Sequence, residues 1–342
     1  MLKLLRKRRN EALLLILLIL IWTALIVGTT IIIHPQVYLN NILIATQFDS
    51  EIGWVPIPNR ISIISTNQHI TTNQQGFRSE EIDPSKRNIL ILGDSLIFGY
   101  GVDDDETISY YLEKTLKERH YDNVQVLNMG VPGYGIDQYY LFLKRYVNQT
   151  NPLLIILNLF AGNDIQDTIH DHAYGKSKPL YRWKNNKLQL ANTPLSKNSC
   201  MSYLSSSWLF THYDFLQHYL KTLCSSHQLE EEETNQVILG LLQEINTQAR
   251  EHHIKLLYVI SPRYGDFTRK SDDLIYFENV LSQNKLPHID LYREINQQSL
   301  SPDLLYINPS KDGNHYTPLG NAFVAKVIYE HLNITKSTSR RR

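Results

Sequence analysis

The chain has 342 residues, enough for one large domain with an appendage or for two modest domains. Its 34 basic and 34 acidic residues cancel to a formal net charge of zero, and 42% of its residues are hydrophobic. This balance argues against a nucleic-acid-binding protein, which needs a basic surface, and against an acidic disordered chain.

Basic residues are concentrated at the N-terminus, directly before a long apolar run. Residues 1–10 include five Lys or Arg residues and no acid, whereas residues 12–33 carry no charge. A helix of that length spans the roughly 30 Å core of a bilayer and exceeds the apolar region of about 7–15 residues in a cleavable signal peptide. We therefore predict a cytoplasmic basic segment over 1–11 and a retained transmembrane anchor over 12–33. The positive-inside rule then places the rest of the chain in the periplasm or outside the cell.

Residues 34–87 are polar and weakly β-like. Within them, "RISIISTNQHITTNQQGFR" alternates Ile with Ser and Thr, a pattern typical of a short hairpin or edge strands. We interpret this segment as a spacer and a subdomain that laps over the main domain.

A regular alternation of strands and helices begins at residue 88. Short apolar runs predict buried strands within 88–95, 124–130, 152–164, 254–262 and 286–292. Helical spacing of apolar residues predicts helices within 106–120, 136–149, 234–253, 271–284 and 317–333. This alternation indicates an α/β domain over 88–333, with a parallel sheet of five strands covered by helices on both faces.

One part of this region departs from the alternation, and a short tail follows the region. Residues 165–232 form a long insertion after the third strand, with a small hairpin and an aromatic-rich helix expected, and a segment there can overhang a site. Residues 334–342 are a basic tail. The insertion holds Cys200 and Cys224. On the oxidising side of a membrane they can form a structural disulfide; the alternative is a pair of unbonded thiols.

Polar residues with chemical potential follow the ends of the predicted strands. Ser95 follows the first strand, Gly130 the second and Asn163 the third, while Asp312 and His315 lie between the fifth strand and the last helix. Because ligands bind beyond the carboxyl ends of strands in an open parallel sheet, we expect all five residues at one edge of the sheet.

Each of these residue types suits one role in nucleophilic catalysis. A serine hydroxyl such as that of Ser95 needs a neighbouring base, and the imidazole of His315 titrates near neutral pH. Asp312, three residues earlier, can orient that imidazole. Backbone N–H groups of Ser95 and Gly130 and the side-chain amide of Asn163 can stabilise an oxyanion.

Together these motifs resemble those of the SGNH, or GDSL-type, hydrolase family. The blocks are Gly93-Asp94-Ser95-Leu96, Gly130, Gly162-Asn163-Asp164 and Asp312-Gly313-Asn314-His315. The resemblance covers residues 88–333 and implies a flavodoxin-like three-layer fold. It further implies a Ser95 nucleophile, a His315 base, an Asp312 orienting group and an oxyanion hole of Ser95, Gly130 and Asn163, without a metal or an organic cofactor.

These observations lead to a main hypothesis and two alternatives. The main hypothesis is an extracytoplasmic, membrane-tethered serine esterase that removes an acyl group, such as acetyl, from a cell-envelope glycan or lipid. An O-acyltransferase would use the same residues, with a sugar hydroxyl replacing water. A non-catalytic envelope assembly or binding protein is a third possibility, and the intact set of motifs weighs against it.

Some residues near these motifs have simpler interpretations. Asp94 is expected to brace the turn that carries the serine. The aromatic residues Tyr181, Trp183 and Trp208 of the insertion resemble sugar-stacking residues, but such side chains more often serve packing.

Overall fold

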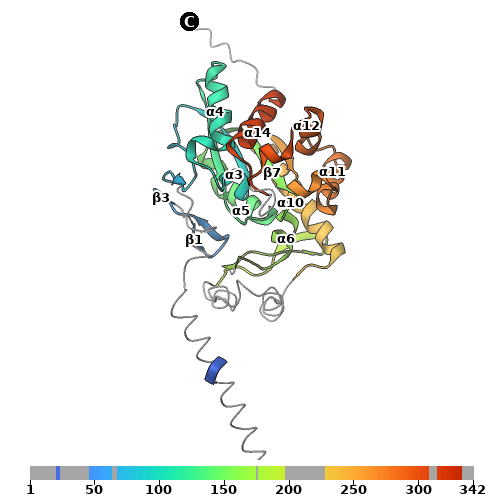
Figure 1. Ribbon diagram of the computed structural model, residues 1–342. Coiled ribbons are helices and arrows are strands. Elements are labelled where there is room, and N and C mark those ends of the chain that lie inside the picture. The colour runs from blue at the N-terminus through green and yellow to red at the C-terminus, as the bar shows by residue number, and fades with distance from the viewer. Residues whose placement is uncertain are drawn as a thin grey trace, which may run out of the picture.

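Figure 1 shows the computed structural model, which describes residues 21–23, 46–63, 68–174, 176–196, 228–307 and 314–332. Several predictions fall outside these ranges: most of the anchor at 12–33, the tail at 334–342, Cys200, Cys224 and Asp312. Among the helices that the structure describes, none is both long and apolar enough to cross a bilayer.

The central sheet has five parallel strands, as predicted. They are β5 (Arg87–Gly93), β6 (Val124–Gly130), β7 (Pro152–Phe160), β12 (Lys255–Ser261) and β13 (His288–Asp290). Their order is β13-β12-β7-β5-β6, and every neighbouring pair is parallel. The chain moves from β5 to β6 and then returns past β5 to β7, so the strand order reverses between β5 and β7. Doubly wound sheets bind ligands beyond the carboxyl ends of the strands at such a reversal.

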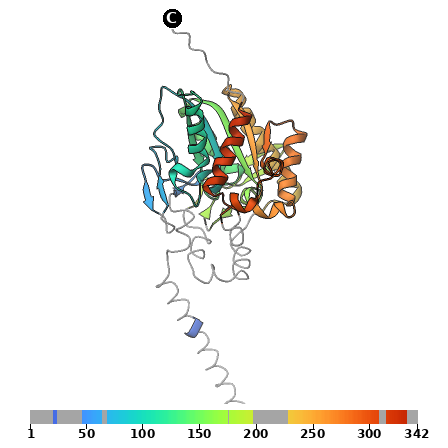
Figure 2. The same cartoon turned by 45° about the horizontal axis from the view of Figure 1, so that its top comes forward.

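Helices cover both faces of the sheet because successive strand residues point to opposite sides. Leu90 and Leu92 belong to one buried apolar cluster, and Ile89 and Ile91 belong to the other. The first cluster receives α5 (Ile136–Tyr146), α10 (Glu231–Glu251) and α11 (Asp272–Gln283). The second receives α4 (Ile108–Glu118), α12 (Leu291–Gln297) and α14 (Pro318–His331). Figure 2 shows α4 and α14 side by side on this second face.

The short helix α12 was absent from the sequence prediction. It begins directly after β13, where the Asp290 carboxylate accepts a hydrogen bond from the Arg293 N–H over 3.1 Å. Asp at the N-cap satisfies a backbone donor that the helix leaves free. The apolar stretch at 286–292 therefore ends as a strand at Asp290 and continues as a helix.

The described part of the 34–87 segment is packed onto the domain. It forms two hairpins: β1 (Thr46–Asp49) with β2 (Gly53–Pro56), and β3 (Ile61–Ile63) with β4 (His69–Thr71). Trp54 and Phe77 are buried in the same apolar cluster as α5 and α10. The Asp49 carboxylate also accepts a hydrogen bond from Arg145 on α5 over 2.8 Å. The segment is therefore a layer of the domain core.

The insertion after β7 begins with α6 (Asp164–Ile169) and continues as two hairpins. These are β8 (His172–Ala173) with β9 (Lys176–Ser177), and β10 (Tyr181–Lys184) with β11 (Lys187–Leu190). In Figure 1, α6 and these strands lie on the same side of the domain as β1. Tyr181 is buried against Tyr140, and Trp183 packs partly buried on the same apolar cluster, so both side chains contribute to packing.

Candidate active site

Ser95 lies at a sharp turn from strand to helix. β5 ends at Gly93, and α3 (Ser95–Phe98) begins two residues later with the Asp94 carboxylate accepting a hydrogen bond from the Leu96 N–H over 3.0 Å. A Cβ on Gly93 would lie 2.4 Å from Ile97 Cγ1, so only glycine permits so close an approach of the helix. Asp94 is fully buried, and burial raises the pKa of its carboxyl. Asp94 therefore braces the turn, as the sequence predicted.

His315 is brought to Ser95 from the other end of the domain. Its Nε2 atom lies 2.9 Å from Ser95 Oγ, although 220 residues separate the two in sequence. The backbone of His315 is held by the Ile307 N–H, which donates to the His315 carbonyl oxygen over 2.8 Å. The Tyr100 ring lies beside the imidazole, with ring centroids 4.7 Å apart. This geometry lets His315 take the Ser95 proton, while the orienting role of Asp312 stays a prediction.

Gly130 is close to Ser95 but its N–H points elsewhere. The Gly130 N–H donates to Asn128 Oδ1 over 3.0 Å. A Cβ at this position would lie 2.1 Å from the backbone nitrogen of Phe98, so the glycine allows α3 to pack on β6. The predicted role of Gly130 as an oxyanion donor therefore does not fit the structure, because the group is already used.

Gly133, in the same loop, fits the donor role instead. The loop starts beside the nucleophile turn, where the Val131 N–H donates to the Gly93 carbonyl oxygen over 3.0 Å. Gly133 has a φ of 76°, a left-handed conformation that favours glycine. Its N–H has no hydrogen-bond partner in the described part of the chain. The repeated glycines of "NMGVPGYG" did not reveal which one carries an open N–H.

Asn163 is the N-cap residue of α6 and lies three residues after the end of β7. Its Nδ2 atom donates to Asp167 Oδ2 over 2.6 Å and lies 3.2 Å from the Tyr174 hydroxyl oxygen. Its Oδ1 atom is buried and has no hydrogen-bond partner among the described residues. Thus the amide is held by two residues of the insertion, neither of which the sequence analysis selected.

Comparison with known proteins shows the family of this chain. The profile of the family described as GDSL-like Lipase/Acylhydrolase matches residues 89–328. The chain belongs to this family. It is therefore an SGNH/GDSL-type ester hydrolase, with the corresponding α/β fold. Among curated proteins, no sequence matches the chain.

Solved structures similar to this hydrolase are distant in sequence. "Crystal Structure of TesA" is 13% identical, covers 71% of this chain and 97% of its own, and has a TM-score of 0.42. The psychrotrophic esterase EstA from Pseudoalteromonas sp. is 14% identical, and the match covers 72% of this chain and 96% of EstA with a TM-score of 0.40. The acetyl xylan esterase AlAXEase is 15% identical, and the match covers 71% of this chain and 98% of AlAXEase with a TM-score of 0.40.

The N-terminal layer of this esterase supports the loop that carries Gly133. Trp54 Nε1 donates to the Pro132 carbonyl oxygen over 3.1 Å, and the Tyr134 hydroxyl donates to the Trp54 carbonyl oxygen. Trp54 and Tyr134 are both fully buried. These contacts clamp the loop on both sides of Gly133. Little in the sequence signals this role, because no motif distinguishes Trp54 from the other aromatic residues of the polar 34–87 segment.

Proposed function

We propose that this hydrolase is a serine esterase that works through an acyl intermediate on Ser95. The observation that carries the proposal is the 2.9 Å contact between His315 Nε2 and Ser95 Oγ at the carboxyl edge of the sheet. A hydroxyl is a weak nucleophile until a neighbouring base removes its proton. Ser95 is therefore the nucleophile and His315 the general base.

In the first half of the reaction, Ser95 Oγ attacks the carbonyl carbon of the ester. The Ser95 proton moves to His315 Nε2, and the carbonyl oxygen becomes an oxyanion. The N–H groups of Ser95 and Gly133 and the Asn163 amide are the donors for this oxygen. The tetrahedral intermediate collapses when the C–O bond to the leaving alcohol breaks, and His315 returns the proton to that alcohol.

Water completes the reaction. His315 accepts a proton from water as its oxygen attacks the acyl carbon on Ser95. The second tetrahedral intermediate breaks the bond to Ser95 Oγ, which recovers a proton from His315, and the carboxylic acid leaves. Asp312 supports the imidazolium in both halves of the reaction.

The location and the substrate class follow from the N-terminal sequence. The basic segment at 1–11 and the apolar run at 12–33 favour a tether that leaves the catalytic domain on the periplasmic or outer side of the membrane. Esters available to a domain so tethered are acylated cell-envelope glycans and lipids. We infer that one of these is the substrate.

The test is trapping with a fluorophosphonate, followed by mass mapping of the adduct. The full chain in detergent micelles should label at Ser95 and release p-nitrophenol from p-nitrophenyl acetate. Ser95→Ala should abolish both, and Ser282→Ala, which changes an exposed serine on α11, should leave both unchanged. An adduct on another residue, or full turnover by Ser95→Ala, would refute the assignment.

A further inference from the structure

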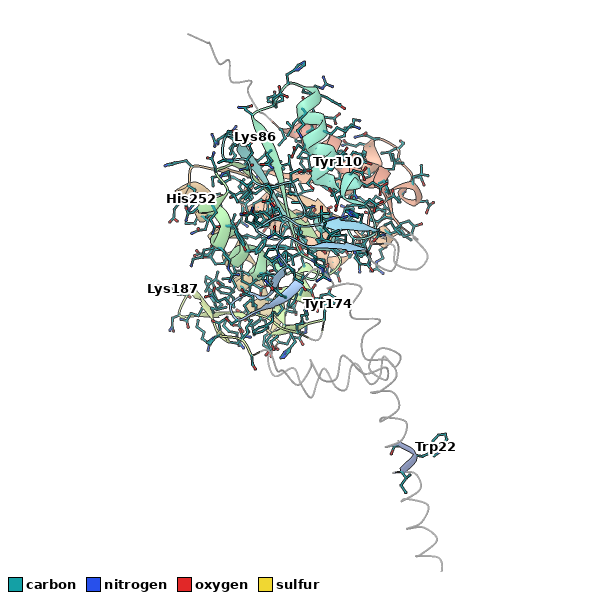
Figure 3. The ribbon with its side chains drawn as sticks, turned by 90° about the vertical axis from the view of Figure 1, so that its left-hand side faces the viewer. Trp22, Lys86, Tyr110, Tyr174, Lys187 and His252 are labelled. Atoms are coloured by element: carbon teal, nitrogen blue, oxygen red, sulfur yellow. The ribbon has the colours of Figure 1, made fainter. Side chains whose placement is uncertain are left out.

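The tip of the β8–β9 hairpin reaches the oxyanion region of the site. Tyr174 occupies the turn between His172–Ala173 and Lys176–Ser177 and has a φ of 51°, a left-handed value that is rare for a residue with a side chain. Its ring lies against Gly133, so closely that a Cβ there would be 2.4 Å from Tyr174 Cε2. Figure 3 shows Tyr174 in the lower part of the folded domain, whereas Lys86, the residue before β5, lies in its upper part.

The Tyr174 hydroxyl joins the second of the two donor loops. It donates to Asp167 Oδ2 over 3.1 Å and accepts from Asn163 Nδ2 over 3.2 Å. One side chain therefore touches Gly133, in the loop after β6, and Asn163, in the loop after β7. The distance between these two proposed oxyanion donors therefore depends on the position of the Tyr174 side chain.

Asp167 fixes the orientation of the Asn163 amide. It lies one helical turn after Asn163, and its Oδ2 atom accepts from both Asn163 Nδ2 and the Tyr174 hydroxyl. An amide nitrogen has two N–H groups. The shorter contact, 2.6 Å, holds one of them on Asp167, and the longer, 3.2 Å, leaves the other on the tyrosine oxygen. A negatively charged substrate oxygen is the stronger acceptor and displaces the tyrosine from that second N–H.

The base of the hairpin is anchored, so its tip is held in place. Lys178, directly after β9, is fully buried and pairs with the buried Asp137 carboxylate of α5. Its backbone N–H donates to the Asp171 carbonyl oxygen over 2.9 Å. Lys176 Nζ donates to Thr46 Oγ1 over 3.1 Å and lies 5.7 Å from the centre of the Trp54 ring.

We propose that Asp167 and Tyr174 are positioning residues of the esterase, which hold the Asn163 amide and the Gly133 loop in the geometry that receives the oxyanion. The proposal rests on the function proposed above. It assigns part of the insertion at 165–232 to the catalytic site, although neither residue touches the reacting atoms.

The experiment is a double-mutant cycle on the full chain in detergent micelles, with p-nitrophenyl acetate as substrate. Tyr174→Phe keeps the ring on Gly133 and removes only the hydroxyl. We expect kcat to fall about tenfold with KM within about twofold, because loss of a donor itself costs about 10²–10³ and loss of its support costs less. Asp167→Ala should lower kcat further. Tyr140→Phe is the matched control, since it removes another tyrosine hydroxyl bonded to a carboxylate, Glu244, over 3.3 Å.

The cycle separates positioning from general stability. In an Asn163→Ala background, Tyr174→Phe should change kcat less than about twofold, because residues that act through one another are not additive. Equal losses in both backgrounds, a kcat unchanged or raised by Tyr174→Phe, or a rise in KM alone would overturn the proposal. If the Asp167→Ala variant does not fold, the effect of Tyr174→Phe on kcat in the two backgrounds tests the proposal by itself. A wild-type chain that neither turns over nor labels at Ser95 refutes the proposed function instead.

Discussion

The Arg78 guanidinium donates through Nη1 to the Gly99 carbonyl oxygen over 2.7 Å, immediately beyond the helix that begins with Ser95. Arg78 is almost fully buried. It also donates to the carbonyl oxygens of Phe98, Val102 and His69 and to the carboxylate of Asp104. One side chain of the N-terminal layer therefore holds the whole turn that follows the nucleophile helix.

Replacing Arg78 by Met should strongly destabilise the domain. Several buried carbonyl oxygens would lose their donor, and each unsatisfied group costs about 1–3 kcal/mol. We expect the free energy of unfolding to fall by at least about 3 kcal/mol in urea titration, on the same scale. Arg78→Lys should recover only part of this lost free energy of unfolding, because an ammonium cannot reproduce the planar set of donors. Arg87→Lys, at an exposed position, is the control and should leave the free energy of unfolding nearly unchanged.

Trp54→Phe should slow catalysis as well as lower stability. The phenyl ring keeps most of the apolar packing but leaves the Pro132 carbonyl oxygen without its donor. Since Gly133 is the next residue, we expect a loss of kcat of about tenfold, in the range that a small misplacement of catalytic groups produces. Steady-state kinetics on p-nitrophenyl acetate measures it. Phe48→Leu, on the exposed partner strand of the same hairpin, should retain wild-type kcat; an equal loss there would contradict the explanation.

Asp167 should make stability depend on pH. Burial raises the pKa of its carboxyl from 3.8 to about 7, against the opposing effect of the Asn163 hydrogen bond. The folded state then holds the proton more tightly than the unfolded state, so this stabilisation is complete below about pH 4 and is lost as the pH rises through about 7. Asp137, with a pKa raised by burial to about 6, acts in the same direction.

The measurement for Asp167 is Tm between pH 5 and pH 8, conditions that bracket its pKa of about 7. Wild-type Tm should fall as the pH rises, and Asp167→Asn should fall less steeply because amides do not titrate. Asp83→Asn is the control: the pKa of that exposed carboxyl is lowered by the Ser85 hydrogen bond, so it stays ionised throughout this range. Identical slopes for wild type and Asp167→Asn would exclude the predicted ionisation.

The buried pair of Lys178 and Asp137 should behave as a unit. Both side chains are fully buried, and removing one partner leaves the other charge uncompensated. We expect Lys178→Met to lower the free energy of unfolding by about 3–5 kcal/mol in urea titration. The double variant Lys178→Met/Asp137→Asn should recover at least half of this loss. Lys178 Nζ also donates to the carbonyl oxygens of His170 and Pro179. A double variant as unstable as the single one would show that these two hydrogen bonds, and not the charge of Lys178, dominate.

Strand periodicity made the fold predictable. The run at 88–95 and its four counterparts became the five parallel strands, because a strand buried on both faces must be apolar throughout. Ser95 and Asn163 were selected as candidates for the same reason, since polar residues at the ends of such strands collect at one edge of the sheet. His315 was selected from its spacing to Asp312 and to the last helix, and the structure places it beside Ser95.

Residue type and order along the chain were sufficient for the class of fold and for choosing Ser95 and His315 as the candidate nucleophile and base, since these choices depend on local periodicity and on short motifs. Tertiary structure alone distinguished the two glycines: the Gly130 N–H donates to Asn128, whereas the Gly133 N–H has no partner among the described residues. It also showed that Trp54 and Arg78 hold loops next to Ser95 and Gly133. Each does so through contacts with residues distant in sequence, and sequence spacing carries no record of such contacts.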